Sequence, residues 1–141
     1  TVRVRVTIPI STLKSDSADR DEEILAIMNT VEFPNIEFIS VWFAREELRQ
    51  YLNERKTELQ GDLTIKGKSH QVSFPLQFRP QPKEWIIEGR LITSFSAFEV
   101  VVPAVAGGMI AQPSDLLELW LHLSTSKIEG GVELLQEIGE W

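Results

Sequence analysis

The chain has 141 residues, of which 43% are hydrophobic and 25% are charged, and its formal net charge is -7. This length suits one domain spanning residues 1–141, and no stretch of about 20 apolar residues predicts a membrane span. The negative charge and the scattered basic residues argue against nucleic acid as a partner. Because the sequence has no cysteine, disulfides, thiolate nucleophiles and cysteine-ligated metals are excluded, and the compartment stays open between cytoplasm and periplasm.

The first ten residues alternate in a way that is typical of a strand with one buried face. Val2, Val4, Val6 and Ile8 alternate with arginine and threonine. Pro9 lacks an amide donor, which fits the end of a strand or the edge of a sheet. We therefore predict a strand that packs its valines inward.

Two helices are predicted in the part of the chain that follows this first strand. Asp19 and Glu22 have the spacing of a helix cap, and the apolar stripe from Ile24 to Met28 predicts a helix of two or three turns. Residues 44–56 lose all strand alternation and are rich in helix formers. We interpret them as an inserted surface helix.

The remaining elements are predicted to be five strands and a terminal helix. Residues 36–43 form a strand that is apolar on both faces, with Phe38 and Trp42 on the same face. The other elements are a hairpin from residues 58–66 and 71–79, a long strand from 84–97, a last strand from 117–123 and a short amphipathic helix from 132–138. In the last strand the leucines face inward, which leaves Trp120 on the wetter side.

Three motifs resemble a known family. Residues 20–22 read RDE, residues 33–38 read FPNIEF, and GDLTIKG at residues 61–67 is followed by QVSFPLQF at residues 71–78. On these motifs, residues 1–126 resemble the YceI-like family of lipocalin-like barrels. The resemblance implies a mainly β, antiparallel barrel with one or two short helices around a long apolar cavity. It also implies binding of polyisoprenoid chains, such as quinone tails, or of amphiphilic lipids.

The same resemblance predicts an incomplete barrel. Family members usually begin with roughly two further strands, and the pattern here yields six or seven strands where a small closed barrel has about eight. Either a preceding N-terminal segment or a neighbouring chain would complete the wall, because a long unpaired edge invites aggregation. Residues 94–101, SFSAFEVV, depart from the family pattern, so no head-group contact is carried over to them.

The inward apolar side chains of the predicted strands are the candidate ligand-binding residues. They either fill the barrel as a solid core, as is usual in small barrels, or leave room for an apolar guest, as the resemblance implies. The ten candidates are Phe38, Trp42, Leu63, Ile65, Phe74, Phe78, Leu91, Phe95, Leu119 and Leu121.

No catalytic or metal site is predicted. His70 and His122 have no neighbour at ligand spacing. The acidic residues between positions 19 and 23 fit the first turn of a helix without any further role. The serines of residues 11–17 have neither a nucleophile elbow nor a spaced histidine partner.

We therefore predict a non-enzymatic protein that binds a polyisoprenoid, quinone or fatty-acyl chain for transport or sequestration. Apart from such a bound lipid, no cofactor is expected. The alternative is an interaction module with a filled barrel core that dimerises through an edge strand. We expect a homodimer in either case, and an exposed Trp120 beside His122 would mark its interface.

Overall fold

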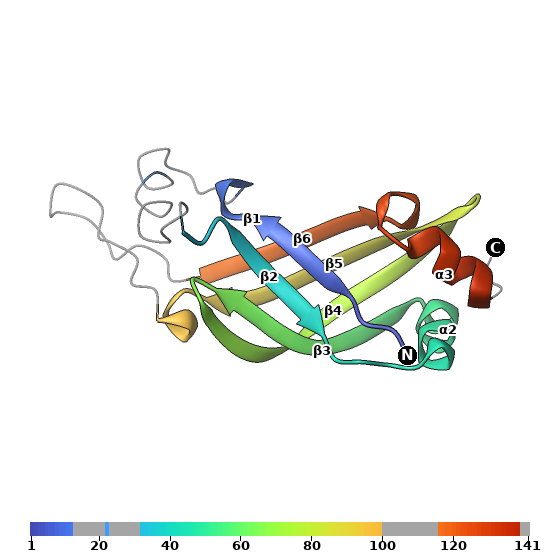
Figure 1. Cartoon of the computed structure of the whole chain (residues 1–141), viewed down its shortest axis with the longest axis horizontal. Coiled ribbons are helices and arrows are strands. Elements are labelled where there is room, and N and C mark those ends of the chain that lie inside the picture. The colour runs from blue at the N-terminus through green and yellow to red at the C-terminus, as the bar shows by residue number, and fades with distance from the viewer. Residues whose placement is uncertain (13–21, 23–31, 100–115, 139–141) are drawn as a thin grey trace, which may run out of the picture.

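A computed structural model describes residues 1–12, 22, 32–99 and 116–138 of the chain (Figure 1). Within them, six strands form one antiparallel sheet in the order β1-β2-β3-β4-β5-β6. The strands are β1 (Arg5–Pro9), β2 (Asn35–Ser40), β3 (Lys56–Ile65), β4 (Lys68–Gln81), β5 (Glu84–Ser94) and β6 (Leu116–Ser124). Helices α2 (Arg45–Glu54) and α3 (Gly131–Ile138) and the 3-10 turns η1 (Ile10–Thr12), η2 (Ser96–Phe98) and η3 (Thr125–Lys127) complete the described part. The predicted mainly β, antiparallel fold with short helices is confirmed.

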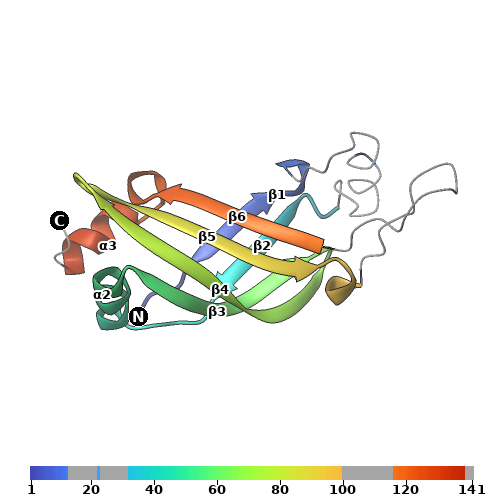
Figure 2. The same ribbon diagram turned by 180° about the vertical axis from the view of Figure 1, so that it is seen from behind.

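The sheet curls without closing. Each strand pairs only with its neighbours along the chain, so β1 and β6 are the two edges within the described residues. In Figure 1, β1 and β2 lie in front of β5 and β6, and Figure 2 shows the reverse order from behind. The curl therefore gives the sheet an inner face, and no described strand fills the opening between β1 and β6.

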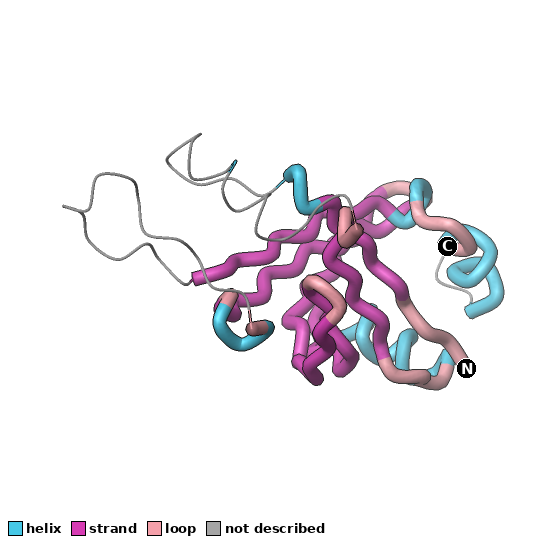
Figure 3. Tube along the Cα trace, turned by 60° about the vertical axis from the view of Figure 1, so that its left-hand side comes forward, coloured by secondary structure: helices cyan, strands magenta, loops and turns pink. Residues whose placement is uncertain are grey.

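Helices α2 and α3 lie together at one end of the curl, whereas η1 and η2 lie at the other end (Figures 1 and 3). The Arg45 side chain of α2 donates a hydrogen bond to Glu137 of α3, at 3.0 Å between Nε and Oε2. None of the described helices is both long and apolar enough to cross a membrane.

Helix α2 matches the helix predicted for residues 44–56. Its first turn is held by Glu47, whose Oε1 accepts the backbone N–H of Ala44 at 3.2 Å. The helix ends at Arg55, which has a left-handed φ of 64°. The helix predicted around residues 19–28 falls almost wholly outside the described residues.

The predicted hairpin is formed by β3 and β4. Ile65 pairs with Lys68, so Lys66 and Gly67 form a two-residue turn with φ angles of 50° and 77°. Positive φ at both positions is typical of the type I′ turn that suits the twist of a hairpin. The strand predicted at residues 117–123 and the helix predicted at 132–138 correspond to β6 and α3.

The predicted inward orientation of Trp42 is wrong. Its side chain is 59% exposed, and the neighbouring Phe43 is buried instead. The cause is one extra residue in the segment opposite residues 2–4. Val4 is hydrogen-bonded to Ser40 and Val2 is hydrogen-bonded to Phe43, so a step of two residues on one side faces a step of three on the other. Such a bulge shifts the alternation by one position, so the side chains beyond it change faces.

Candidate functional site

The interior of the curl is solidly packed at the end that carries η1 and η2, which we call the packed end. Side chains from the strands and from both turns meet there and are almost fully excluded from solvent. They include Ile10 of η1, Ile36, Leu63, Ile65, Leu119 and Phe98 of η2. This region fits the expectation of a filled core.

An aromatic pair marks the boundary of the packed end. The rings of Phe38 and Phe74 meet edge to face, with centroids 5.3 Å apart and an interplanar angle of 69°. Two glycines give these rings their space. A Cβ on Gly61 would lie 2.7 Å from Cζ of Phe38, and one on Gly89 would lie 2.9 Å from Cε1 of Phe74. Both positions therefore need a residue without a side chain.

Beyond this pair, toward α2 and α3, the interior is hollow. A cavity of about 350 Å³ lies there, at the lower end of the usual range of roughly 300–1,000 Å³ for small-molecule sites. We call it the apolar cavity. The valines of residues 2–6, in and just before β1, line it together with Leu48 and Leu52 of α2 and Leu134 and Leu135 of α3. The central strands contribute mostly leucine and phenylalanine.

The apolar cavity extends to the opening between the two sheet edges. Arg5 and Thr7 line it although they occupy the exposed positions of β1. On the other side it is lined by Ile128, Glu129 and Gly131, which follow β6. The apolar cavity is therefore bounded by residues at or near both edges of the sheet.

The polar groups of the cavity are few and lie around an apolar interior. Tyr51 of α2 is half-buried, and its hydroxyl donates a hydrogen bond to Oε2 of Glu47 at 3.3 Å. Burial raises the pKa of this phenol, and the negative charge of Glu47 and its hydrogen bond raise it further, against a lowering contribution from Thr57. The Tyr51 hydroxyl is therefore protonated at neutral pH, and its single proton is engaged by Glu47.

The ten predicted ligand-binding residues separate into three groups. Phe38, Phe74, Phe78 and Leu121 line the apolar cavity. Leu63, Ile65, Leu91, Phe95 and Leu119 are buried in the main hydrophobic cluster and do not line it. Trp42 is on the outer surface, where the Arg3 guanidinium lies 4.5 Å from its ring centroid.

Several cavity residues were not among the sequence candidates. The most important are in the helices, because Leu48, Tyr51 and Leu52 turn one face of α2 toward the cavity. Their spacing at i, i+3 and i+4 is the signal of a helix with a buried face. The helix that the sequence suggested was a surface insertion is therefore part of the cavity wall.

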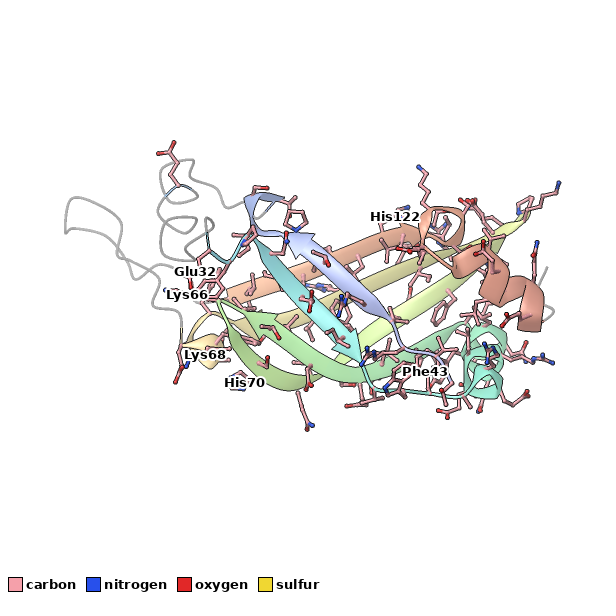
Figure 4. All side chains as sticks on the ribbon, in the orientation of Figure 1. Glu32, Phe43, Lys66, Lys68, His70 and His122 are labelled. Carbon is pink, nitrogen blue, oxygen red and sulfur yellow. The ribbon has the colours of Figure 1, made fainter. Side chains whose placement is uncertain are left out.

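The two histidines lie apart on different strands, as Figure 4 shows for His70 on β4 and His122 on β6. The ring of His70 packs edge-on against Phe98, with centroids 4.9 Å apart. Among the described residues, no three His, Asp or Glu side chains gather into a group that could hold a metal ion.

Comparisons with known proteins agree with this architecture. The family model of the YceI-like domain matches residues 1–119. Among solved structures, the YceI protein of Campylobacter jejuni is similar with a TM-score of 0.64 at 16% identity, covering 87% of this chain and 71% of that one. BcnA of Burkholderia cenocepacia is similar with a TM-score of 0.64 at 20% identity, covering 85% of this chain and 72% of that one. No curated protein matches the chain by sequence.

Proposed function

This chain belongs to the YceI-like family, and on that basis we propose that it binds an acyl or isoprenoid chain in the apolar cavity without chemical turnover. The observation that carries the proposal is the hollow end itself. Its walls are aliphatic and aromatic side chains from β1, the central strands and both helices. Binding of such a chain would serve its transport or sequestration.

The physical argument starts from the empty space. Side chains that face a void lack partners on one side and lose their dispersion contacts. Apolar cavities hold water poorly because a water molecule needs two to four polar partners, so an apolar guest is the occupant that such walls favour. The walls of this cavity therefore select for hydrocarbon.

The cavity volume limits the length of the enclosed segment. A water-sized group occupies about 30 Å³ in the liquid, so a volume of about 350 Å³ holds a chain segment of about a dozen carbon atoms. The remainder of a longer polyisoprenoid would lie outside this volume. The fit is better for a medium-length acyl or isoprenoid chain than for a fully enclosed long one.

The expected affinity is moderate. Burial of about a dozen methylenes contributes about 10 kcal/mol at most, at about 0.8 kcal/mol each. Loss of translational and rotational freedom opposes binding by at least about 4 kcal/mol. Dissociation constants in the micromolar to millimolar range are therefore expected, which suits a carrier that must also release its ligand.

The test fills the cavity and measures binding of dodecanol and dodecanoic acid by calorimetry. Leu121→Trp enlarges a side chain that lines the cavity, and Val4→Phe does the same from the segment just before β1. The matched control is Ile92→Trp, which adds a similar bulk on the exposed outer face of β5. We expect the filled variants to lose at least tenfold in affinity, by about 1.4 kcal/mol or more, and the control to bind as the parent chain does.

Native mass spectrometry of the purified chain gives an independent readout of a co-purified lipid. Circular dichroism and thermal unfolding establish that each variant is folded. The proposal is wrong if the parent chain binds neither probe up to its solubility limit. It is equally wrong if folded variants with a filled cavity bind both probes as tightly as the parent chain does.

A further inference from the structure

Two hydroxyl side chains are buried among the described residues, and they differ in how their hydrogen-bonding capacity is used. Ser40 is 3% exposed and Thr125 is 6% exposed. The Oγ of Ser40 accepts the backbone N–H of Val4 at 2.8 Å and donates to the carbonyl oxygen of Val41 at 2.9 Å. The hydroxyl of Ser40 therefore has a partner both as a donor and as an acceptor.

The hydroxyl of Thr125 has a partner only as an acceptor. Its Oγ1 accepts the backbone N–H of Trp85 at 2.9 Å, and no described residue accepts its proton. A hydroxyl carries one donor, and a buried donor without an acceptor costs free energy. Because Thr125 lines the apolar cavity, a guest in that cavity can supply the missing acceptor.

Thr125 is held in place by the residues on either side of it. Ser124 and Ser126 both donate to Oε2 of Glu84, at 2.9 Å each, which ties the turn η3 to the start of β5. The bond from the Trp85 N–H then fixes Oγ1 of Thr125, so the proton can only rotate about the Cβ–Oγ1 bond. A donor that is already positioned loses little conformational entropy when a ligand binds.

The charges near this hydroxyl favour a neutral acceptor over an anion. Arg5 and Glu129 are the charged residues among the described lining of the cavity, and their charges cancel. Glu84 adds a further carboxylate beside η3, whereas Lys127 of the same turn is exposed and does not line the cavity. An anionic head group would therefore be buried without excess positive charge to compensate it, which is costly.

We propose that the Thr125 hydroxyl donates a hydrogen bond to a neutral carbonyl oxygen on the bound chain, so that the preferred ligands are long-chain ketones and esters. Plain hydrocarbons lack the acceptor, and free fatty-acid anions carry an unfavourable charge. This inference rests on the proposed function, because it names the polar group carried by the guest of the same cavity. It uses the inner wall at β5 and η3 and does not depend on either edge of the sheet.

The position of Thr125 also orients the guest. Thr125 comes four residues after Leu121, which lines the cavity near the Phe38–Phe74 pair. Four residues of extended chain span about 13 Å. A carbonyl at Thr125 therefore leaves room for an apolar tail that runs along the wall toward the packed end. The oxygen should accordingly lie near one end of the ligand and not at its middle.

Two isomeric ketones test both the acceptor and its position. The ligands 2-dodecanone and 6-dodecanone have the same composition, so they differ only in where the oxygen lies. We expect the parent chain to bind 2-dodecanone about fivefold more tightly, as measured by calorimetric displacement of dodecanol. Methyl dodecanoate should likewise bind more tightly than dodecanoate, because its carbonyl carries no charge.

Three variants assign the preference to the Thr125 hydroxyl. Thr125→Val keeps the shape of the side chain and removes the donor, so both ketones should bind equally. Thr125→Ser keeps the hydroxyl and should keep the preference for 2-dodecanone. Ser40→Ala is the matched control, because it removes a buried hydroxyl that does not line the cavity, and it should also keep the preference.

Infrared spectroscopy of the parent chain gives a readout that needs no variant. The carbonyl stretch of bound 2-dodecanone should lie at lower frequency than that of the same ketone in dodecane, because a hydrogen bond weakens the C=O bond. An unshifted stretch would overturn the inference.

The remaining outcomes separate this inference from the proposed function. If dodecanol binds but the two ketones bind equally to the parent chain, the carbonyl site is wrong and the cavity stands. The same conclusion follows if folded Thr125→Val keeps the preference, or if dodecanoate binds more tightly than methyl dodecanoate. If the parent chain binds none of these probes, the proposed function and this inference are both wrong.

Discussion

The packed end and the hollow end are built from the same strands with the same alternation, and they differ in the size of the side chains in adjacent cross-strand rows. In the row nearest the packed end, Leu59 pairs with Phe74, and Leu91 pairs with Leu119. In the next row, a threonine, two leucines and a glycine face inward, namely Thr57, Leu76, Gly89 and Leu121. The smaller side chains of the second row leave space unfilled, so the strands form the wall of a cavity there and not a solid core.

The two ends also differ in what covers them. At the packed end, Ile10 and Phe98 enter from the turns η1 and η2 and fill the space between the facing strands. At the hollow end, α2 and α3 cover the end of the apolar cavity, and their leucines pack against side chains of β4 and β5. The comparison shows that alternation determines which face is buried, whereas the volume of the covering residues determines whether that face is filled.

The largest expected effect comes from truncating two neighbouring inward leucines of β6, one in the packed core and one that lines the apolar cavity. Leu119→Ala removes a side chain that is 2% exposed in the main cluster, and we expect it to lower the free energy of unfolding by about 4 kcal/mol. Leu121→Ala faces an existing cavity, and we expect a smaller loss of about 2 kcal/mol. Urea unfolding measures both. An equal or larger loss for Leu121→Ala would contradict the distinction between the two ends.

A second prediction concerns the boundary between the ends. A Cβ on Gly61 would lie 2.4 Å from the carbonyl oxygen of Ile39 and 2.7 Å from Cζ of Phe38. Since the carbonyl belongs to the sheet ladder and cannot move freely, Gly61→Ala should lower the free energy of unfolding by about 3 kcal/mol. It should also displace the Phe38 ring and weaken dodecanol binding.

The matched control for this change is Gly130→Ala. Gly130 has a left-handed φ of 76°, and no heavy atom lies within 4 Å of an added Cβ. The backbone strain alone should lower the free energy of unfolding by about 1 kcal/mol and leave ligand affinity unchanged. If both alanine variants were equally stable, the tight approach at Gly61 would not be a constraint on the fold.

The sequence predicted the strands well because a half-buried strand needs strict alternation. Leu117, Leu119 and Leu121 of β6 are buried on the inner face as expected, and Trp120 is on the outer face. The valines among the first six residues also pack against the core. The prediction for Trp42 failed because one extra residue beside β1 reversed the alternation, and nothing in residues 40–43 marks that bulge. A bulge depends on the pairing between two strands, which a single run of sequence does not contain.

The candidate site was predicted only in part for a related reason. Alternation identified Phe38, Phe74, Phe78 and Leu121 as inward, but it could not separate them from Leu63 or Leu119, which have the same pattern. The difference arises from the register that places Thr57, Leu76 and Leu121 in one cross-strand row. Register follows from tertiary structure, so the position of the cavity could not be derived from periodicity.

The smallest expected effect concerns the contact between the two helices over the cavity. Arg45 and Glu137 are about half exposed, and a pair of this kind contributes roughly 0.5 kcal/mol to stability. A double-mutant cycle with Arg45→Ala and Glu137→Ala should give that coupling energy and lose it in high salt. Because the pair joins α2 to α3 over the hollow end, its loss should also speed dodecanol release in stopped-flow measurements.

The pair of Lys68 and Glu99, 3.1 Å apart, provides the comparison, since it joins exposed side chains from β4 and from the residue after η2, beside the packed end. Removing it should give a similarly small coupling energy and leave the release rate unchanged, because no cavity lies beneath it. Two ion pairs with similar coupling energies would then differ in their effect on the ligand release rate, because only one of them lies over the apolar cavity. If both cycles changed the release rate alike, the helices would not control access to the cavity.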